Sequence, residues 1–287
     1  MRKMYGITQE EELAVRFYMG DPAAVRSGIW RGGPAAYNTI NALLHPGSSN
    51  ERDKAAEGRH FGIEDKAMLE EYMQLIVCVF SAMVKYRNAV QDTSGGGQLI
   101  SWRIDRASSL ESFAADGGLI AGFFSTCRSG LLPQYARAKK RPVLLQVVRQ
   151  PAVPFLDFSE LLQDLYAKPE EAEVLLPFGS VIEDMQPQPL TEEDADRFRD
   201  MDGHAPAGRW RLTVDCGTYP VLPEEESRRL RDRVLSRAQQ AGLVMARLEE
   251  GFPLSGQEEA FYKEWKKELL TYVSGQAGLI LAGRGRG

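Results

Sequence analysis

The sequence Glu171-Ala172-Glu173-Val174-Leu175-Leu176-Pro177 places two carboxylates directly before a run of apolar, strand-forming residues. If this stretch is extended, the period-two alternation of a β-strand puts Glu171 and Glu173 on one face and Val174 and Leu176 on the opposite, core-facing one. Two carboxylates on one side of a strand suit glycosyl transfer, in which one stabilises a cationic sugar carbon and the other orients or deprotonates the nucleophile. An isolated Glu-x-Glu is more often a solvated junction between a loop and a strand. The rest of the chain decides between the two interpretations.

The composition is that of an ordinary globular protein. Of the 287 residues, 43% are hydrophobic and 26% are charged, which suits one large domain or two modest ones. The net charge of −5 argues against a general nucleic-acid binder, because binding to phosphate backbones needs clustered positive charge. The basic stretches at 137–141 and 284–286 are short, and we interpret them as solvated surface and a frayed end.

Cysteine and histidine usage indicates neither a disulfide framework nor a metal site. The three cysteines, Cys78, Cys127 and Cys216, lack C-x-x-C spacing, and the three histidines lie far apart. The N-terminus has no apolar signal segment, and the longest apolar run, 75–84, is too short to cross a bilayer. We therefore expect a protein that is made in the cytoplasm and has no membrane partner. Such a protein either stays there or is secreted or delivered into a target cell by a route that leaves no Sec-type signal.

Helical periodicity dominates the first 97 residues. Thr8 and Glu11 form a capping-box pattern before an amphipathic segment that ends near residue 19. A second helix is expected at 34–44. The strongest helical signal runs from 64 to 90, where apolar residues recur at three- and four-residue spacing, and it predicts a helix largely buried against a sheet.

The period changes to two between residues 98 and about 220. The stretch 98–105 alternates, with Ile100 and Trp102 on one face and Arg103 and Asp105 on the other. The run 142–148 predicts a central strand covered on both faces. Strands at this density, with only short helices near 107–115 and 159–166, predict an α+β protein with a curled or two-sheet β core. The other strands are expected at 119–127, 173–177, 181–183 and 210–215.

Two charged amphipathic helices, 224–250 and 258–274, follow a proline-bounded segment at 220–223. Their apolar stripes are no wider than a contact with the core requires, which favours packing over binding a partner.

Three segments, in order along the chain, resemble the R-S-E signature of arginine-specific mono-ADP-ribosyltransferases, a family with toxin- and effector-like members. They are Trp102-Arg103, the stretch 122–127 and the stretch 171–177. The helical preface with Tyr37-x-x-Ile40-Asn41 is also similar, and the match covers about residues 8–215. The resemblance implies an ADP-ribosyltransferase-like split β-sandwich core with an N-terminal helical lobe and C-terminal helices. The implied transferase domain covers 1–222, with the lobe over about 1–97 and the β core over about 98–222, and 223–287 is a C-terminal helical extension.

The resemblance also implies an enzyme that takes NAD as a co-substrate, uses no metal, and moves ADP-ribose to an arginine of a target protein with release of nicotinamide. Arg103 would hold the NAD phosphates, a task suited to a forked and permanently charged donor. The backbone at Ile104 would bind the nicotinamide carboxamide. Ser125 would position the catalytic carboxylate, and Thr126 would shape the floor of the site.

Glu173 would stabilise the oxocarbenium-like transition state, and Glu171 would orient the incoming guanidinium and help to remove its proton. Arg128 and Tyr135 occupy the place of a family loop over the nicotinamide phosphate and are candidate NAD contacts. The stretch 166–170 occupies the place of the acceptor-binding loop. The sequence departs from the family where Ile104 replaces the usual Gly, and where Ser-Thr-Cys at 125–127 replaces Ser-Thr-Ser.

Two other functions stay open at this point. An NAD glycohydrolase would use water as the acceptor in the same site. A catalytically inactive module would instead bind a partner through its terminal helices. A nucleic-acid acceptor for the transfer is disfavoured by the acidic balance of the chain.

Overall fold

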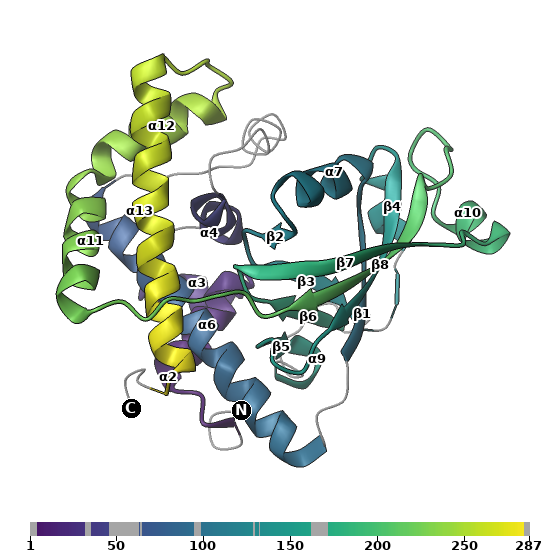
Figure 1. Ribbon diagram of the computed structural model, residues 1–287, viewed down its shortest axis with the longest axis horizontal. Coiled ribbons are helices and arrows are strands. Elements are labelled where there is room, and N and C mark those ends of the chain that lie inside the picture. Colours follow the sequence, from purple (N-terminus) through teal and green to yellow (C-terminus); the bar gives the residue numbers. More distant parts are fainter. Residues whose placement is uncertain are drawn as a thin grey trace. The chain divides into compact units, whose positions relative to one another are not determined.

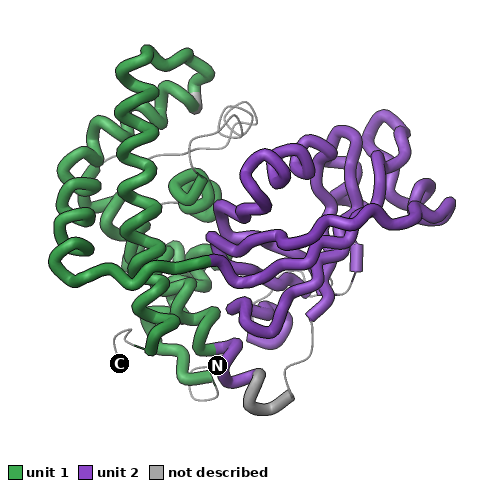
Figure 2. The backbone as a smooth tube through the Cα atoms, viewed as in Figure 1, with its two compact units in different colours: residues 1–85, 218–287 green, residues 86–217 purple. Residues whose placement is uncertain are grey.

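The computed structural model describes residues 5–31, 36–45, 63, 65–94, 99–128, 130–131, 133–161 and 172–283, without the side chains of 91–94 and 249. Over these residues the chain is a mixed α/β protein with an open, mixed eight-stranded sheet and eleven helices (Figure 1). Contacts divide the chain into unit 1, residues 1–85 with 218–287, and unit 2, residues 86–217 (Figure 2). The segment predicted as a C-terminal extension, 223–287, is thereby grouped with the N-terminal helices.

Within the described residues, unit 1 is helical. Its elements are α2 (Gln9–Tyr18), α3 (Pro22–Arg26), α4 (Ala36–Leu44), the part of α6 (Lys66–Ser94) up to residue 85, α11 (Glu224–Ser236), α12 (Ala238–Glu249) and α13 (Gly256–Leu281). The predicted capping box begins α2: the Glu11 N–H donates to Thr8 Oγ1, and the Thr8 N–H donates to the Glu11 carboxylate. The single helix predicted over 224–250 is two helices, because Arg237 (φ −106°, ψ 6°) leaves the helical conformation between them.

The apolar stripe of α6 is buried, as predicted, but the described residues of unit 1 contain no strand, so the predicted packing against a sheet is not seen within this unit. Two side chains of α6 bond α2: Ser81 and Lys85 both donate to the Glu11 carboxylate. The stretch Lys66–Val90 is long and apolar enough to cross a membrane. However, 67% of that window is buried inside the protein, and the core helix of a soluble protein passes the same test. The fully buried members of the stripe are Leu69, Leu75, Ile76, Val79, Phe80, Ala82 and Met83.

The C-terminal helices pack against the other helices of unit 1, as predicted. The buried Trp265 donates from Nε1 to the carbonyl of Val234 over 3.1 Å, which joins α13 to α11. Lys266 is only 1% exposed and donates from Nζ to the carbonyls of Ala42 and Leu43 (2.9 Å to Leu43). A cation bound to the last carbonyls of α4 satisfies acceptors that a helix end leaves open and complements the helix dipole.

Unit 2 holds the sheet, in the order β2-β7-β8-β4-β1-β3-β6-β5. β4 pairs with β1 in antiparallel and with β8 in parallel orientation, and seven of its eight residues are buried, so the predicted central strand is confirmed. β1 and β3 are joined at a single position, Trp102 opposite Cys127. The strands are β1 (Leu99–Arg106), β2 (Leu119–Ile120), β3 (Phe124–Cys127), β4 (Pro142–Arg149), β5 (Leu156–Asp157), β6 (Glu173–Leu176), β7 (Ser180–Gln188) and β8 (Gly208–Asp215).

Four short helices accompany the strands of unit 2. Both α7 and α8 contact β1, and α9 contacts β5 and β6. The predicted helix at 107–115 is confirmed as α7, and the described part of the one predicted at 159–166 is α9. The helices are α7 (Ala107–Ala115), α8 (Pro133–Arg137), α9 (Phe158–Leu161) and α10 (Glu192–Arg197).

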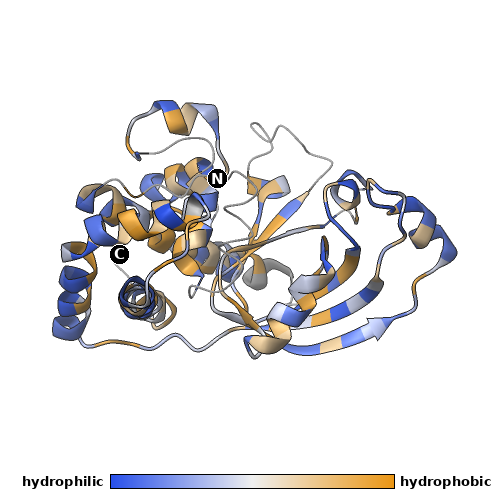
Figure 3. Cartoon of the chain, turned by 90° about the horizontal axis from the view of Figure 1, so that it is seen from above, coloured by the Kyte–Doolittle hydropathy of each residue, from blue (hydrophilic) through white to orange (hydrophobic). Residues whose placement is uncertain are grey.

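Two strand predictions were wrong in detail. The expected strand 119–127 is broken at residues 121–123, and its halves pair far apart in the sheet, β2 with β7 and β3 with β6. Ile100, assigned to an apolar face of β1, is 45% exposed. In register, the Ile100 face is mixed: it carries Gln146 and Arg211, but also the buried Val148, opposite Ile100, and the buried Ile104. Hydrophilic and hydrophobic residues alternate along the long strands in Figure 3, as expected for a sheet with one solvent-exposed face.

Candidate functional site

Arg103 extends from β1 to the neighbouring strand β3. Its Nη1 donates to the carbonyl of Ser125 over 2.6 Å, and its Nε donates to Asp105 over 2.7 Å. The guanidinium carbon lies 4.5 Å from the centre of the Phe124 ring, in cation–π contact. The side chain is 28% exposed, and Nη2 has no hydrogen-bond partner among the described residues. The arginine is therefore held by three contacts and keeps free N–H groups at Nη2.

Ser125 and Glu173 meet across the β3–β6 pair. The Ser125 hydroxyl donates to Glu173 Oε1 over 2.5 Å, a short distance of the kind seen for hydrogen bonds to a carboxylate. Both residues are half-buried, and in the ladder Ser125 lies opposite Leu175 while Cys127 lies opposite Glu173. The structure thus brings together three of the four predicted catalytic residues, in a chain of hydrogen bonds from Arg103 through Ser125 to Glu173.

Glu171, the fourth predicted catalytic residue, lies outside the described residues, as does the predicted acceptor loop at 166–170. The assumption that the chain is extended through this stretch was wrong at Ala172, whose φ is +38° and which precedes β6. This left-handed conformation is costly for a residue with a Cβ and is often found at functional sites. The Ala172 carbonyl is fixed by the N–H of Arg128 over 2.9 Å. Simple alternation therefore does not relate Glu171 to Glu173.

Arg128 does not present a free guanidinium. Its Nη1 donates to Asp157 over 2.6 Å and to Glu160 over 3.2 Å, and the Asp157 side chain is only 1% exposed. Two carboxylates therefore bind one nitrogen of Arg128, and its predicted contact with NAD stays a prediction. Its place beside Ala172 gives it a structural role at the base of the Glu-x-Glu segment.

Three other predicted contacts have structural partners. Ile104 is 6% exposed and belongs to an apolar cluster with Ala136, Leu144 and Phe198, against which Tyr135 packs. The Tyr135 ring therefore lies with Ile104 in this cluster. The buried hydroxyl of Thr126 donates to the carbonyl of Val174 over 3.0 Å and ties β3 to β6 directly beside Ser125.

The predicted site residues did not include Asp105, which the structure places against Arg103. Burial by itself would raise the pKa of Asp105, but the charges of Arg103 and Lys139 and the hydrogen bonds from Arg103 and the Arg106 N–H outweigh it, so the pKa is lowered. The carboxylate is therefore ionised at neutral pH. The period-two spacing of Arg103 and Asp105 could have revealed the pair, since residues two apart on a strand share a face.

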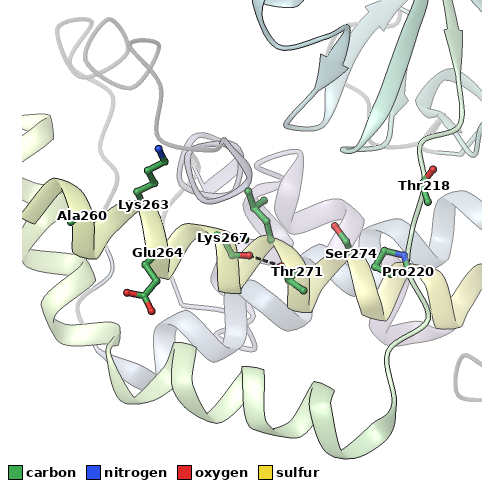
Figure 4. A pocket seen from close by; sticks show the side chains of 9 residues that line it. Thr218, Pro220, Ala260, Lys263, Glu264, Lys267, Thr271 and Ser274 are labelled. Carbon is green, nitrogen blue, oxygen red and sulfur yellow. Dashed lines mark hydrogen bonds between the residues drawn. The ribbon is translucent and has the colours of Figure 1, made fainter.

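Two other features are separate from this group. A hollow of about 780 Å³ on unit 1 is lined by residues of α13, with Thr218 and Pro220, and by none of the predicted site residues (Figure 4). Ligand atoms of Asp200, Asp202 and His204 lie within 4.8 Å of one another. Because one carboxylate oxygen of Asp200 already accepts the N–H groups of Asp202 and His204, these contacts are those of a tight turn, and we assign no metal to it.

No family model, curated protein or solved structure matches this chain.

Proposed function

We propose that the protein is an NAD-dependent mono-ADP-ribosyltransferase that moves ADP-ribose from NAD to an arginine side chain of a target protein and releases nicotinamide. The observation that carries the proposal is the continuous set of contacts from Arg103 through Ser125 to Glu173. The three residues come from three strands and span 70 positions of the chain. Three ordinary surface residues would have little reason to be in contact.

The donor groups suit NAD. A diphosphate is recognised well by a guanidinium that is fixed in orientation and still has N–H groups to offer, and Arg103 meets both conditions. Cleavage of the bond between nicotinamide and ribose develops positive charge on the sugar carbon. The Glu173 carboxylate, oriented by the Ser125 hydroxyl, supplies the negative charge that stabilises it.

The sheet is compatible with the implied split β-sandwich. β1 and β3 pair at one position only, whereas β1 and β4 pair along eight. A junction this narrow lets the five strands from β2 to β1 and the three strands from β3 to β5 turn away from each other. We propose that the arginine on one group and the serine and glutamate on the other face a shared NAD cleft at this junction.

The experiment is incubation of the purified protein with labelled NAD and a cell lysate, followed by mass spectrometry of the modified peptides. We expect ADP-ribose on arginine, release of nicotinamide, and loss of both in Glu173→Gln. The exposed Glu183 on β7 provides a matched control, and Glu183→Gln should remain active. Free ADP-ribose without labelled protein would indicate an NAD glycohydrolase. Absence of NAD cleavage, NAD binding and labelling would refute the proposal in favour of a catalytically inactive interaction module.

A further inference from the structure

We propose that Asp105 is a positioning residue that orients Arg103 for the diphosphate of NAD, an inference that rests on the proposed function. Asp105 follows Arg103 by two residues on β1. Arg103 pairs with Leu145 of β4 and Asp105 pairs with Val143, so both side chains lie on the same face of the sheet. Asp105 is only 8% exposed, and a buried carboxylate needs compensating partners.

The carboxylate is itself held rigidly. Its Oδ1 accepts the Arg106 N–H and the Ser109 hydroxyl, each over 2.9 Å, at the start of α7. Its Oδ2 is left for the Arg103 Nε–H at 2.7 Å. The N-terminus of a helix favours negative charge, so α7 supports the carboxylate in this place.

Arg103 is consequently fixed from three sides: by Asp105 at Nε, by the Ser125 carbonyl at Nη1, and by the Phe124 ring beside the guanidinium plane. The N–H groups at Nη2 have no partner among the described residues and remain available to a ligand. Because Ser125 also bonds Glu173, the same contacts set the distance from the phosphate-binding edge to the catalytic carboxylate. A flexible arginine would still attract NAD but would not hold it in register with Glu173.

Asp105 lowers the net charge beside the phosphates, so a site built only for charge attraction would not contain it. Its presence makes sense if orientation contributes more than charge. Removal of the negative charge of Asp105 should therefore weaken the binding of NAD, although NAD is itself negatively charged.

The first test is Asp105→Asn, which keeps the shape and loses the charge. We expect the KM for NAD to rise about tenfold with a smaller change in kcat, and the affinity for ADP-ribose, which keeps the diphosphate, to fall by a similar factor. Nicotinamide, which has no phosphate, should bind unchanged. Asp105→Glu, which restores the charge, should recover part of the loss, and the exposed Asp116→Asn at the end of α7 serves as the matched control.

The second test is independent of NAD. In protein with ¹⁵N-labelled arginine, the Arg103 Nε–H signal, assigned by its loss in Arg103→Lys, should exchange slowly with solvent, and Asp105→Asn should shift it and speed its exchange. If the signal is unchanged, or if Asp105→Asn binds NAD as tightly as the wild type or tighter, the positioning role is wrong. If the signal responds as expected but the wild type neither binds nor cleaves NAD, Asp105 still orients Arg103. In that case the proposed function is wrong, and so is the role of Asp105 in binding NAD. Circular dichroism of each variant checks that it folds, and if Asp105→Asn does not, Asp105→Ser, which also removes the charge, takes its place in both measurements.

Discussion

Replacing Ser125 with alanine tests the link at the centre of the candidate site. The substitution removes one oxygen and leaves the backbone of β3 unchanged, so the Ser125 carbonyl can still accept from Arg103. The Glu173 carboxylate loses the hydroxyl that donates to it over 2.5 Å. The change therefore separates the orientation of Glu173 from the position of Arg103.

The magnitude follows from the environment of that bond. A hydrogen bond to a charged group contributes about 1.5–3 kcal/mol. Ser125 and Glu173 are half-buried, so water can replace the hydroxyl, and the lower end applies. A loss of about 1.5 kcal/mol corresponds to roughly a tenfold fall in kcat/KM.

The assay is nicotinamide release from NAD under steady-state conditions, measured for Ser125→Ala beside the wild type. The control is Ser180→Ala, which removes a fully buried hydroxyl that bonds the Pro177 carbonyl over 3.0 Å and should leave kcat/KM unchanged. A Ser125→Ala enzyme within twofold of the wild type would refute the role of this hydrogen bond. A fall as large as that of Glu173→Gln would mean that the hydroxyl does more than orient the carboxylate.

Three further predictions concern the acceptor, the helical unit and the response to acid. Glu171→Gln should abolish transfer to protein while nicotinamide release from NAD persists; loss or survival of both activities would contradict the division of labour between the glutamates. Lys266→Met removes the cation bound to the last carbonyls of α4 and should cost about 2 kcal/mol, seen as a lower midpoint in thermal unfolding; an unchanged or higher midpoint would show that the buried charge costs as much as its bonds contribute. Burial alone would raise the pKa of Glu11, but hydrogen bonds from Ser81, the Thr8 N–H and Lys85 lower this pKa below 4.5. The stability that the Glu11 carboxylate contributes is therefore present above about pH 4.5 and is lost as the pH falls through the lowered pKa. Glu11→Gln should therefore make the midpoint of urea unfolding less dependent on pH between about 5 and 3 than in the wild type, and equal slopes would contradict this.

Features that depend on neighbours in the chain were predictable from the sequence. The capping box at Thr8 and Glu11 uses groups three residues apart, and the structure contains both of its hydrogen bonds. The apolar stripe of α6 and the central place of β4 follow from periodicity and from an unbroken apolar run. Local geometry fixes such elements, so a window of about ten residues contains the information.

Features that depend on distant partners were not predictable from the sequence. The same stretch of apolar residues, 119–127, supplies strands to two separate parts of the sheet, and its hydropathy does not reveal the break. Ile100 is exposed although its partner on β4, Val148, is buried, and no pattern within β1 reveals this difference. The left-handed conformation of Ala172 is likewise held by the N–H of Arg128, which directly follows β3 and lies more than forty residues earlier in the chain.

For the candidate site, the sequence by itself determined which residue types are present and in which order, a cation, a hydroxyl and a carboxylate on three predicted strands. Only the tertiary structure decided that Arg103, Ser125 and Glu173 are within hydrogen-bonding reach, that Asp105 holds the arginine, and that Arg128 is bonded to Asp157. The physical reason is that a hydrogen bond or an ion pair depends on separations of about 3 Å. Strand pairing between distant segments sets those separations, and their spacing along the chain does not.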